Sequence, residues 1–420
     1  MVTQPGRRAA AALAASWLAV IALATLWPAE TTVTLPASCV FCGQFGGVDF
    51  ALNVVLFVPL GLALRWLLGS WRTSVLVGAA TTLVIETLQW RLIPGRDASL
   101  GDLLANTLGT MLGAWLATEG LRWIASTGTA ARRLTVAWGL LTTATIPASA
   151  VLLRPSATRW PQWVQWTPQR PNMGVFSGQL QDVELNGVPI HARDILPPVR
   201  SLDSASRGVT VRATMSGVTR ATQRRAYIVR MANGDEEGFA LEQRRDAVVF
   251  RANLLAARLK LHTIAVELPH AFPIAPDGSD GEPSVVRLEG RSNPAVVTVS
   301  SESPGHTTSV ALRRTVGLGW AMFIPWNFTL GPTWWPANAV WLAALMFPVA
   351  FFAGRTAHRT PDERGRGFTW WPLAMVLATI AVVPATTGLS MPTVGEWIGV
   401  LLGITAGLLP ARLTTSAARR

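Results

Sequence analysis

The sequence predicts a polytopic α-helical membrane protein of about eight spans, with an all-β domain inserted between the fifth and sixth spans. Half of its 420 residues are hydrophobic and only 14% are charged, whereas a soluble globular domain has about 25% charged residues. Eight apolar segments approach the length of a spanning helix, which needs about 20 residues. After the fifth segment, residues 154–315 change to short runs of alternating polarity. These three observations define the fold class.

The eight predicted spans are residues 10–27, 50–68, 73–90, 102–118, 134–153, 336–353, 369–386 and 395–411. If Arg7 and Arg8 mark a cytoplasmic N-terminus, the short outer loops contain only Arg91 and Arg96, and the inner segments contain most other arginines outside the insert. Basic residues accumulate on the cytoplasmic side of membrane proteins. We therefore expect a plasma-membrane protein with both termini in the cytoplasm and residues 154–315 outside.

Residues 316–331 are also apolar, but a further span there would place Arg355 and Arg366 outside the membrane. The charge rule therefore favours an interfacial or re-entrant segment. The net charge of +12 alone is compatible with nucleic-acid binding. The basic residues, however, lie in short clusters beside apolar spans rather than along one face. We expect the lipid bilayer, and no nucleic acid, as the partner of these charges.

Three predicted spans contain pairs of polar side chains at helical spacing: Asp49 and Asn53, Glu86 and Gln89, and Asp102 and Asn106. Residues three or four apart share one face of a helix. A charged side chain costs about 2.5–3.5 kcal/mol at the bilayer centre, so several together indicate a polar network or a site. The predicted topology places all three pairs, together with Arg96 of the following loop, at the outer end of their spans.

Three interpretations of this cluster stay open: a structural network, a binding site and a catalytic site. In the structural interpretation Ser99 and Asp102 form a helix capping box, and Glu86 pairs with Arg96. As a binding site, the cluster would use Asp49, Asn53, Glu86, Gln89, Arg96, Asp102 and Asn106. As a catalytic site, it would use Glu86, Asp49 and Asp102 as acid or base groups, with Arg96 holding an anionic part of the substrate.

Cys39 and Cys42 form a C-x-x-C motif in the first outer loop. Disulfides persist in the oxidising exterior, and a structural zinc site would need four ligands. We therefore expect a local disulfide between these two cysteines, no metal site and no cofactor. The Pro59-Leu60-Gly61 sequence lies within a predicted span, where we expect Gly61 to allow close packing against a neighbouring helix.

The polar pairs form part of a longer pattern: D-x-x-x-N-x-x-x-F-x-P-L-G, then E-x-x-Q, then R-D-x-S-x-x-D-x-x-x-N-x-x-G. It begins at Asp49 and ends at Gly109, and it includes Arg96, Asp97 and Ser99. This pattern resembles the VanZ-like family of bacterial integral membrane proteins over roughly residues 10–120. The resemblance implies a role in the cell envelope and reduced susceptibility to the glycopeptide antibiotic teicoplanin.

The insert contains nine candidate strands: 180–185, 208–214, 226–231, 238–243, 246–251, 263–267, 284–289, 295–300 and 307–313. Asn186-Gly187 and Asn233-Gly234 are typical of tight turns between strands. Many short strands predict a two-sheet sandwich. Residues 176–185 are similar to a strand signature of concanavalin-like or laminin-G-like domains, which implies glycan binding and leaves the strand order open.

The sequence thus predicts three domains. Residues 1–153 form a VanZ-like transmembrane domain of five helices, residues 154–315 an outer β-sandwich, and residues 316–420 a C-terminal region of about three helices. The first functional hypothesis is that the protein binds a lipid-linked envelope component at the outer face and thereby lowers teicoplanin susceptibility. The alternatives are an enzyme acting on a lipid-linked cell-wall substrate, or a membrane-anchored scaffold that binds carbohydrate or protein.

Overall fold

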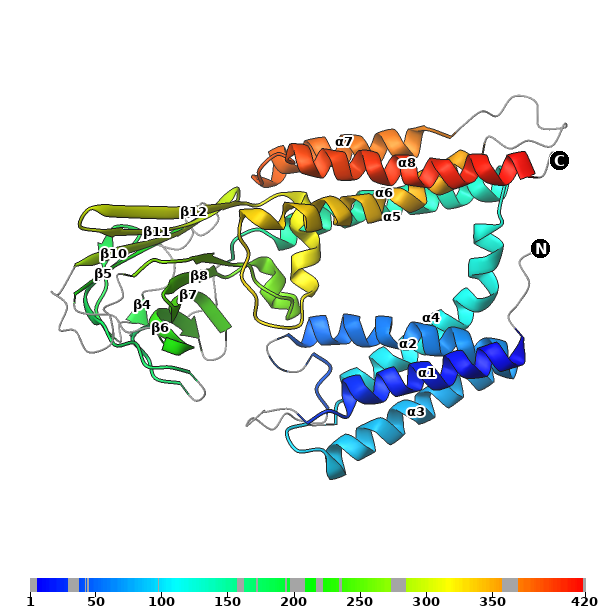
Figure 1. The fold of residues 1–420 in the computed structure, drawn as a ribbon, viewed down its shortest axis with the longest axis horizontal. Helices are drawn as coiled ribbons and strands as arrows, with labels where there is room; N and C mark the ends of the chain where they lie inside the picture. Colours follow the sequence, from blue (N-terminus) through cyan, green and yellow to red (C-terminus); the bar gives the residue numbers. More distant parts are fainter. Residues whose placement is uncertain are drawn as a thin grey trace.

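The molecule is elongated, with helices at one end and β-strands at the other (Figure 1). The computed structural model describes residues 6–28, 38–41, 43, 45–96, 98–156, 162–170, 173–192, 195–196, 208–216, 222–233, 236–272, 285–356 and 369–417.

Most of the helices run along the long axis in alternating directions, so the first helix begins and the last helix ends at the end opposite the strands (Figure 1). The described residues form α1 (Arg7–Thr25), α2 (Gly46–Leu68), α3 (Trp71–Leu92), α4 (Leu100–Ile124), α5 (Gly128–Leu152), α6 (Trp335–Arg355), α7 (Trp371–Thr387) and α8 (Val394–Ala417). Each predicted span overlaps one of these helices. They form two groups, α1–α4 and α5–α8, which Figure 1 shows as separate layers.

Length and composition alone qualify four of the described helices to cross a membrane: α1, α2, α5 and the segment Pro332–Arg355 that contains α6. Trp371–Thr387 and Val394–Leu409 are apolar but shorter. The α3 and α4 helices are long enough but do not meet the composition criterion; α3 contains Glu86 and Gln89, and α4 contains Asp102 and Asn106. The apolar helices show that this is a membrane protein, whereas the expected number of eight spans stays a prediction.

Glycines bring the α2 and α4 backbones into direct contact. A Cβ atom on Gly61 of α2 would lie 2.1 Å from the carbonyl oxygen of Thr110 in α4. Cβ atoms on Gly109 and Gly113 of α4 would lie 2.2 and 1.9 Å from the carbonyl oxygens of Val54 and Val58 in α2. Small residues at four-residue spacing allow this approach between membrane helices. The expected close packing at Gly61 is therefore confirmed.

A second glycine series joins α8 to α6. Gly399 and Gly403 would place Cβ atoms 2.2 and 2.4 Å from the carbonyl oxygens of Ala339 and Ala343, and Gly407 continues the series toward Phe347. This four-residue glycine spacing is visible in the sequence, but no close contact was predicted from it. Each of the two helical groups thus contains one pair of helices whose backbones contact each other at glycines.

Two antiparallel sheets follow α5, in the strand orders β4-β1-β6-β7-β8-β9 and β12-β11-β10-β5-β2-β3. The strands are β1 (Gln162–Trp166), β2 (Gln179–Leu185), β3 (Val188–Pro189), β4 (Ile195–Leu196), β5 (Val209–Ser216), β6 (Thr222–Asn233), β7 (Glu236–Arg245), β8 (Ala247–Ala252), β9 (Ala265–Leu268), β10 (Val286–Ser292), β11 (Val296–Ser303) and β12 (His306–Arg313). All nine predicted strands are present. The sequence analysis did not predict β1, β3 and β4.

The two sheets pack face to face on one hydrophobic core. Leu288 of β10 and Phe250 of β8 are both fully buried in it. A Cβ atom on Gly290 would lie 2.4 Å from the Phe250 ring, so only glycine leaves room for that ring between the sheets. Asn186 and Gly187 have positive φ angles of 52° and 81°, as the tight turn between β2 and β3 requires. Gly234 of the second predicted turn lies outside the described residues, and the concanavalin-like resemblance stays a prediction.

Residues 316–331 do not form a long helix. They begin with a 3₁₀ helix, η3 (Val316–Phe323). Its residues Val316, Leu318 and Ala321 are buried in the core that it shares with the two sheets, β1–β12, which we call the β-domain. A second short 3₁₀ helix, η4 (Pro332–Trp334), leads into α6. A 3₁₀ helix rises about 2 Å per residue, so η3 is about half the length needed to span a bilayer core. The segment joins the β-domain to the second helical group.

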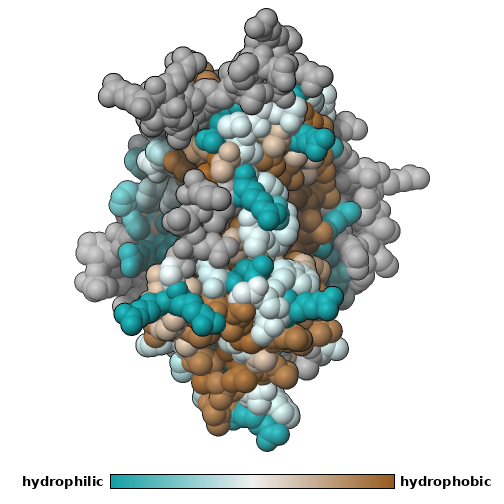
Figure 2. All heavy atoms as spheres, turned by 90° about the vertical axis from the view of Figure 1, so that its right-hand side faces the viewer, coloured by the Kyte–Doolittle hydropathy of each residue, from teal (hydrophilic) through white to brown (hydrophobic). Residues whose placement is uncertain are grey.

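The end of the molecule opposite the β-domain is rich in exposed arginines. Arg7 and Arg8 begin α1, Arg72 lies at the start of α3, and Arg132 and Arg133 lie near the start of α5, all exposed. Figure 2 views the molecule from this end and shows hydrophilic side chains projecting between hydrophobic surfaces. These five arginines therefore lie at one end of the helices, whereas the orientation of the protein in the membrane stays a prediction.

Gly113→Ala should destabilise the protein, because its Cβ atom would overlap the Val58 carbonyl oxygen of α2. Overpacking of this kind costs about 1–3 kcal/mol, which should lower the thermal unfolding midpoint of the detergent-solubilised protein. Gly120→Ala on the same helix is the matched control, since its nearest neighbour would lie at 3.7 Å. Equal unfolding midpoints for the two variants would contradict the proposed backbone contact.

Candidate functional site

A cavity of about 950 Å³ lies among the ends of α1–α4 nearest the β-domain. All seven side chains predicted from the sequence line it: Asp49, Asn53, Glu86, Gln89, Arg96, Asp102 and Asn106. Helical spacing accounts for each pair, and the contact between α2 and α4 brings two of the pairs together. The structure therefore assembles the predicted cluster, while its role stays a prediction.

Asn53 of α2 connects directly to α4. Its Nδ2 donates a hydrogen bond of 2.6 Å to Oδ1 of Asp102. Ser99 caps α4, since its hydroxyl accepts a hydrogen bond of 3.3 Å from the Asp102 backbone N–H. The expected capping box is therefore only half formed, because the Asp102 carboxylate turns toward α2 instead of back to Ser99.

Glu86 supplies the other half of this cap. Its Oε2 accepts a hydrogen bond of 2.8 Å from the Ser99 backbone N–H, and the residue is only 7% exposed. Arg96 instead donates from Nε to the Trp27 carbonyl oxygen at 3.2 Å. The expected Glu86–Arg96 ion pair is absent from the described residues. One carboxylate of α3 thus fixes the start of α4.

Two acceptor atoms in the cavity wall remain without a hydrogen bond. Gln89 donates from Nε2 to the Thr25 carbonyl oxygen at 2.8 Å, which leaves its Oε1 buried and unpaired. Asn106 is 2% exposed, and its Oδ1 also has no partner among the described residues. An unpaired buried polar atom costs about 1–3 kcal/mol. A ligand that donates hydrogen bonds would remove this cost.

The remainder of the cavity wall is apolar. Trp17 of α1 and Leu52, Val55 and Leu56 of α2 line it, and Val55 is 64% exposed on the outer surface of the helices. The cavity therefore has a polar end near the β-domain and an apolar side at the outer surface of the helices. Its described charged groups are three carboxylates and one guanidinium. Such a lining suits an amphiphile whose head group donates hydrogen bonds.

Several lining residues were not predicted from the sequence. Trp17 and Thr25 lie on α1, and Pro325 follows η3, more than 200 positions away from Asp102 along the chain. No local pattern indicates that Pro325 reaches this cavity. The described residues contain no group of three or more His, Cys, Asp or Glu side chains placed to hold a metal ion.

Val40 and Gly43, from the loop before α2, line the cavity. Cys39 is disulfide-bonded, and its carbonyl oxygen accepts hydrogen bonds from the Ser99 hydroxyl and the Gly101 N–H. Cys42 and Asp97 lie outside the described residues, so the predicted Cys39–Cys42 pairing stays a prediction. Through Cys39 this loop is held against the start of α4.

The β-domain docks beside the cavity. The Gly47 N–H donates to the Lys260 carbonyl oxygen at 3.2 Å. The Phe45 ring stacks on His262 at 5.0 Å, and His262 contacts the Phe328 ring at 4.9 Å. Burial and the positive charges of Arg251 and Arg225 lower the pKa of His262 from its ordinary 6.5 to about 4. A neutral imidazole therefore joins the first helical group to the β-domain.

The helices that form the cavity resemble a known protein family. Residues 10–123 match the VanZ/LLP1 family model. This VanZ-like region includes α1–α4 and all seven predicted cavity residues, but less than a third of the chain. The β-domain, α5–α8 and Pro325 lie outside the match. No curated protein and no solved structure matches the chain.

Asn53 and Asp102 should be energetically coupled, because a direct hydrogen bond joins them. In a double-mutant cycle of Asn53→Ala and Asp102→Ala, measured by reversible unfolding in detergent, we expect a coupling energy of about 0.6–2 kcal/mol. Thr87→Ala is the matched control, since Thr87 bonds only within its own helix. Its effect should add to that of Asn53→Ala. Additivity of Asn53→Ala and Asp102→Ala would show that the bond contributes nothing.

The stability of the protein should fall with acidification in a manner that depends on His262. The pKa of His262 is about 4 in the folded protein, below its ordinary 6.5. Between these two pH values the unfolded chain therefore binds a proton at His262 more readily than the folded protein does. The loss between pH 7 and pH 5 is about 2 kcal/mol. Unfolding should therefore depend less on pH in His262→Phe than in the wild type. His306→Phe, on an exposed hairpin, should keep the wild-type pH dependence. If His306→Phe lost it, His262 would not be its source.

Proposed function

We propose that the cavity of the VanZ-like region binds a lipid-linked component of the bacterial cell envelope and thereby lowers susceptibility to teicoplanin. The observation that carries this proposal is the division of one cavity into a polar end, with unpaired acceptors on Gln89 and Asn106, and an apolar side containing the exposed Val55. The match to the VanZ/LLP1 family over residues 10–123 supports a role in the cell envelope.

The charge of the cavity narrows the class of head group. Asp49, Glu86 and Asp102 outnumber Arg96, so a bare phosphate would meet more repulsion than attraction there. Hydroxyl or amino groups, as on a sugar, can donate to the carboxylates and to the free amide oxygens. In this proposal Arg96 pairs with the single anionic link between sugar and lipid, and the chain of the lipid follows the apolar side.

The proposed topology puts the polar end of the cavity at the outer face of the plasma membrane. In this arrangement α1–α8 are eight spans, both termini are cytoplasmic, and residues 154–315 form an outer β-sandwich between the fifth and sixth spans. The exposed arginines at the opposite end of the helices support it, because basic residues favour the cytoplasmic side. An envelope precursor in the outer leaflet would then reach the cavity from the side.

Two other functions differ in what they require of the cavity. An enzyme acting on the same kind of substrate would use Glu86, Asp49 or Asp102 for proton transfer. A scaffold that binds carbohydrate or protein through the β-domain would not need the cavity at all. Glu86→Gln separates these cases, because the amide oxygen can still accept the Ser99 N–H while the carboxylate is lost.

A strain that lacks this protein should become more susceptible to teicoplanin, and the wild-type protein should restore the original susceptibility. Glu86→Gln should restore it only in part, because the cavity loses one of its three carboxylates. The measurement is the minimal inhibitory concentration at equal membrane abundance. Glu119→Gln is the matched control, since Glu119 lies on α4 far from the cavity, paired with Arg122 at 2.8 Å.

The outcome also separates binding from catalysis. Complete loss of function in Glu86→Gln, with unchanged retention of radiolabelled lipid-linked precursor by the purified protein, would favour the enzyme. Parallel loss of precursor binding and of function would support the binding proposal. Full function in Glu86→Gln, or no effect of deleting the gene, would exclude the proposed role of the cavity.

A further inference from the structure

The β-domain contains a second site of different charge. A pocket of about 180 Å³ lies on the face of β6–β8 that points away from the inter-sheet core, and residues 327–329 cover its side. Its described lining is Arg225, Arg244, Arg251, Val249, Asn327, Phe328 and Thr329. Three guanidinium groups and no carboxylate therefore face this space. The acids that pair with these arginines, Glu237, Glu242 and Glu267, are not among the residues that line the pocket.

The deepest of these arginines pairs with one fully buried and one partly buried acid. Arg251 is 6% exposed, and its guanidinium lies 4.0 Å from the fully buried Glu242 and 3.6 Å from Glu237. Arg225 also pairs with Glu242, at 3.2 Å. One buried carboxylate thus orients two guanidinium groups at the pocket. The Nε of Arg251 still has no hydrogen-bond partner among the described residues.

Arg244, the outermost of the three arginines, can bind an anion in place of its present partner. Arg244 is about half exposed and lies 3.4 Å from Glu267. The same carboxylate oxygen of Glu267 accepts a hydrogen bond from the Thr329 hydroxyl at 2.5 Å. An incoming anion could therefore bind Arg244 without leaving Glu267 unpaired. The planar fork of arginine matches the oxygens of carboxylates and phosphates.

We propose that this pocket binds a single carboxylate or phosphate group carried by an envelope lipid or polymer. Its volume is below the range of about 300–1,000 Å³ typical of pockets that enclose whole ligands, so one small group is the expected occupant. Phe328 contributes an apolar wall, and Asn327 and Thr329 add neutral polar groups. Pro325, four residues before Thr329, lines the cavity described above. The inference does not depend on the function proposed for that cavity.

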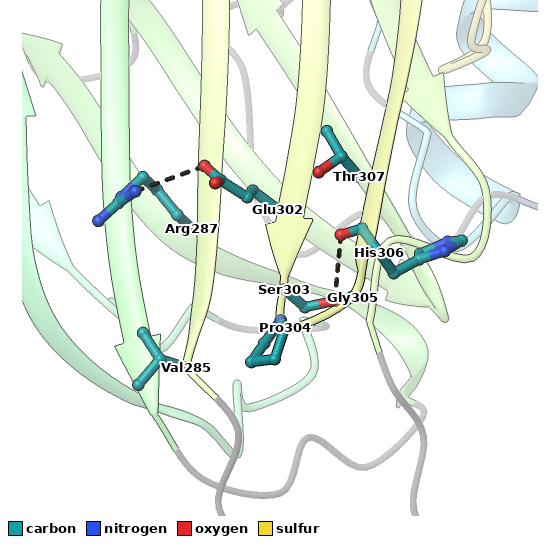
Figure 3. Close-up of a pocket in the computed structure, with 8 residues that line it drawn as sticks. All are labelled: Val285, Arg287, Glu302, Ser303, Pro304, Gly305, His306 and Thr307. Carbon is teal, nitrogen blue, oxygen red and sulfur yellow. Dashed lines mark hydrogen bonds and ion pairs between the residues drawn. The ribbon is translucent and has the colours of Figure 1, made fainter.

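A second hollow in the β-domain provides the contrast. It is larger, about 450 Å³, and lies at the β11–β12 hairpin, where Figure 3 shows Arg287 paired with Glu302. Both side chains are more than half exposed and lie 3.4 Å apart. This hollow has one arginine with its acid in the wall, and none of its lining residues is a buried charged group. It therefore lacks the features of the pocket lined by Arg225, Arg244 and Arg251, which we call the arginine pocket.

The test is titration calorimetry of the full chain in phosphatidylcholine nanodiscs with inorganic phosphate, at constant ionic strength. We expect saturable binding, weakened about tenfold or more by Arg244→Gln, because a charge-assisted bidentate contact is lost. Arg244→Lys should bind with intermediate affinity, since it keeps the charge but not the fork. Arg287→Gln, which breaks an exposed pair of the same length, should bind like the wild type.

The source of the anion is distinguished by lipid composition. If replacing a third of the lipid with phosphatidylglycerol weakens phosphate binding by the wild type, a lipid head group competes for the pocket. If it does not, the group belongs to a molecule outside the bilayer. Both results support the site. Absence of saturable binding by the wild type, or equal affinity in Arg244→Gln, would overturn it, and neither result bears on the cavity of the VanZ-like region.

Discussion

The backbone contact between α2 and α4 determines where the polar side chains of this protein can meet. Gly61, Gly109 and Gly113 contribute no Cβ atoms to this contact, so the carbonyl oxygens of one helix approach the glycines of the other. Only at this separation can the short side chains of Asn53 and Asp102 bond at 2.6 Å. Packing of small residues is a main source of helix association in membranes, where water no longer drives apolar contacts together.

The buried polar atoms of the cluster lower the stability of the protein wherever they lack a hydrogen-bond partner. Glu86 is satisfied by the backbone of Ser99, and Asp102 by Asn53. The amide oxygens of Gln89 and Asn106, by contrast, remain buried and unpaired beside a cavity. A network that existed only to hold helices together would gain from pairing every atom. The free acceptors therefore favour a ligand over a purely structural role, and the apolar side of the cavity favours an amphiphile.

The β-domain is not an independent attachment on the helices. The rings of Phe45, His262 and Phe328 contact one another in series, from the residue before α2 to the segment before α6. That segment lines the cavity with Pro325 and the arginine pocket with residues 327–329. The two spaces also differ in charge, one rich in carboxylates and the other in guanidinium groups.

The sequence by itself determined the helices, most strands and the membership of the polar cluster, because these follow from local spacing along the chain. Residues three or four apart share a helix face wherever that helix packs. Only the tertiary structure decided that Glu86 caps α4 and Arg96 does not pair with it, and that Pro325 reaches the cavity. It also decided that arginines from three neighbouring strands face one pocket. These contacts join segments far apart in the sequence, and no local periodicity encodes the distance between them.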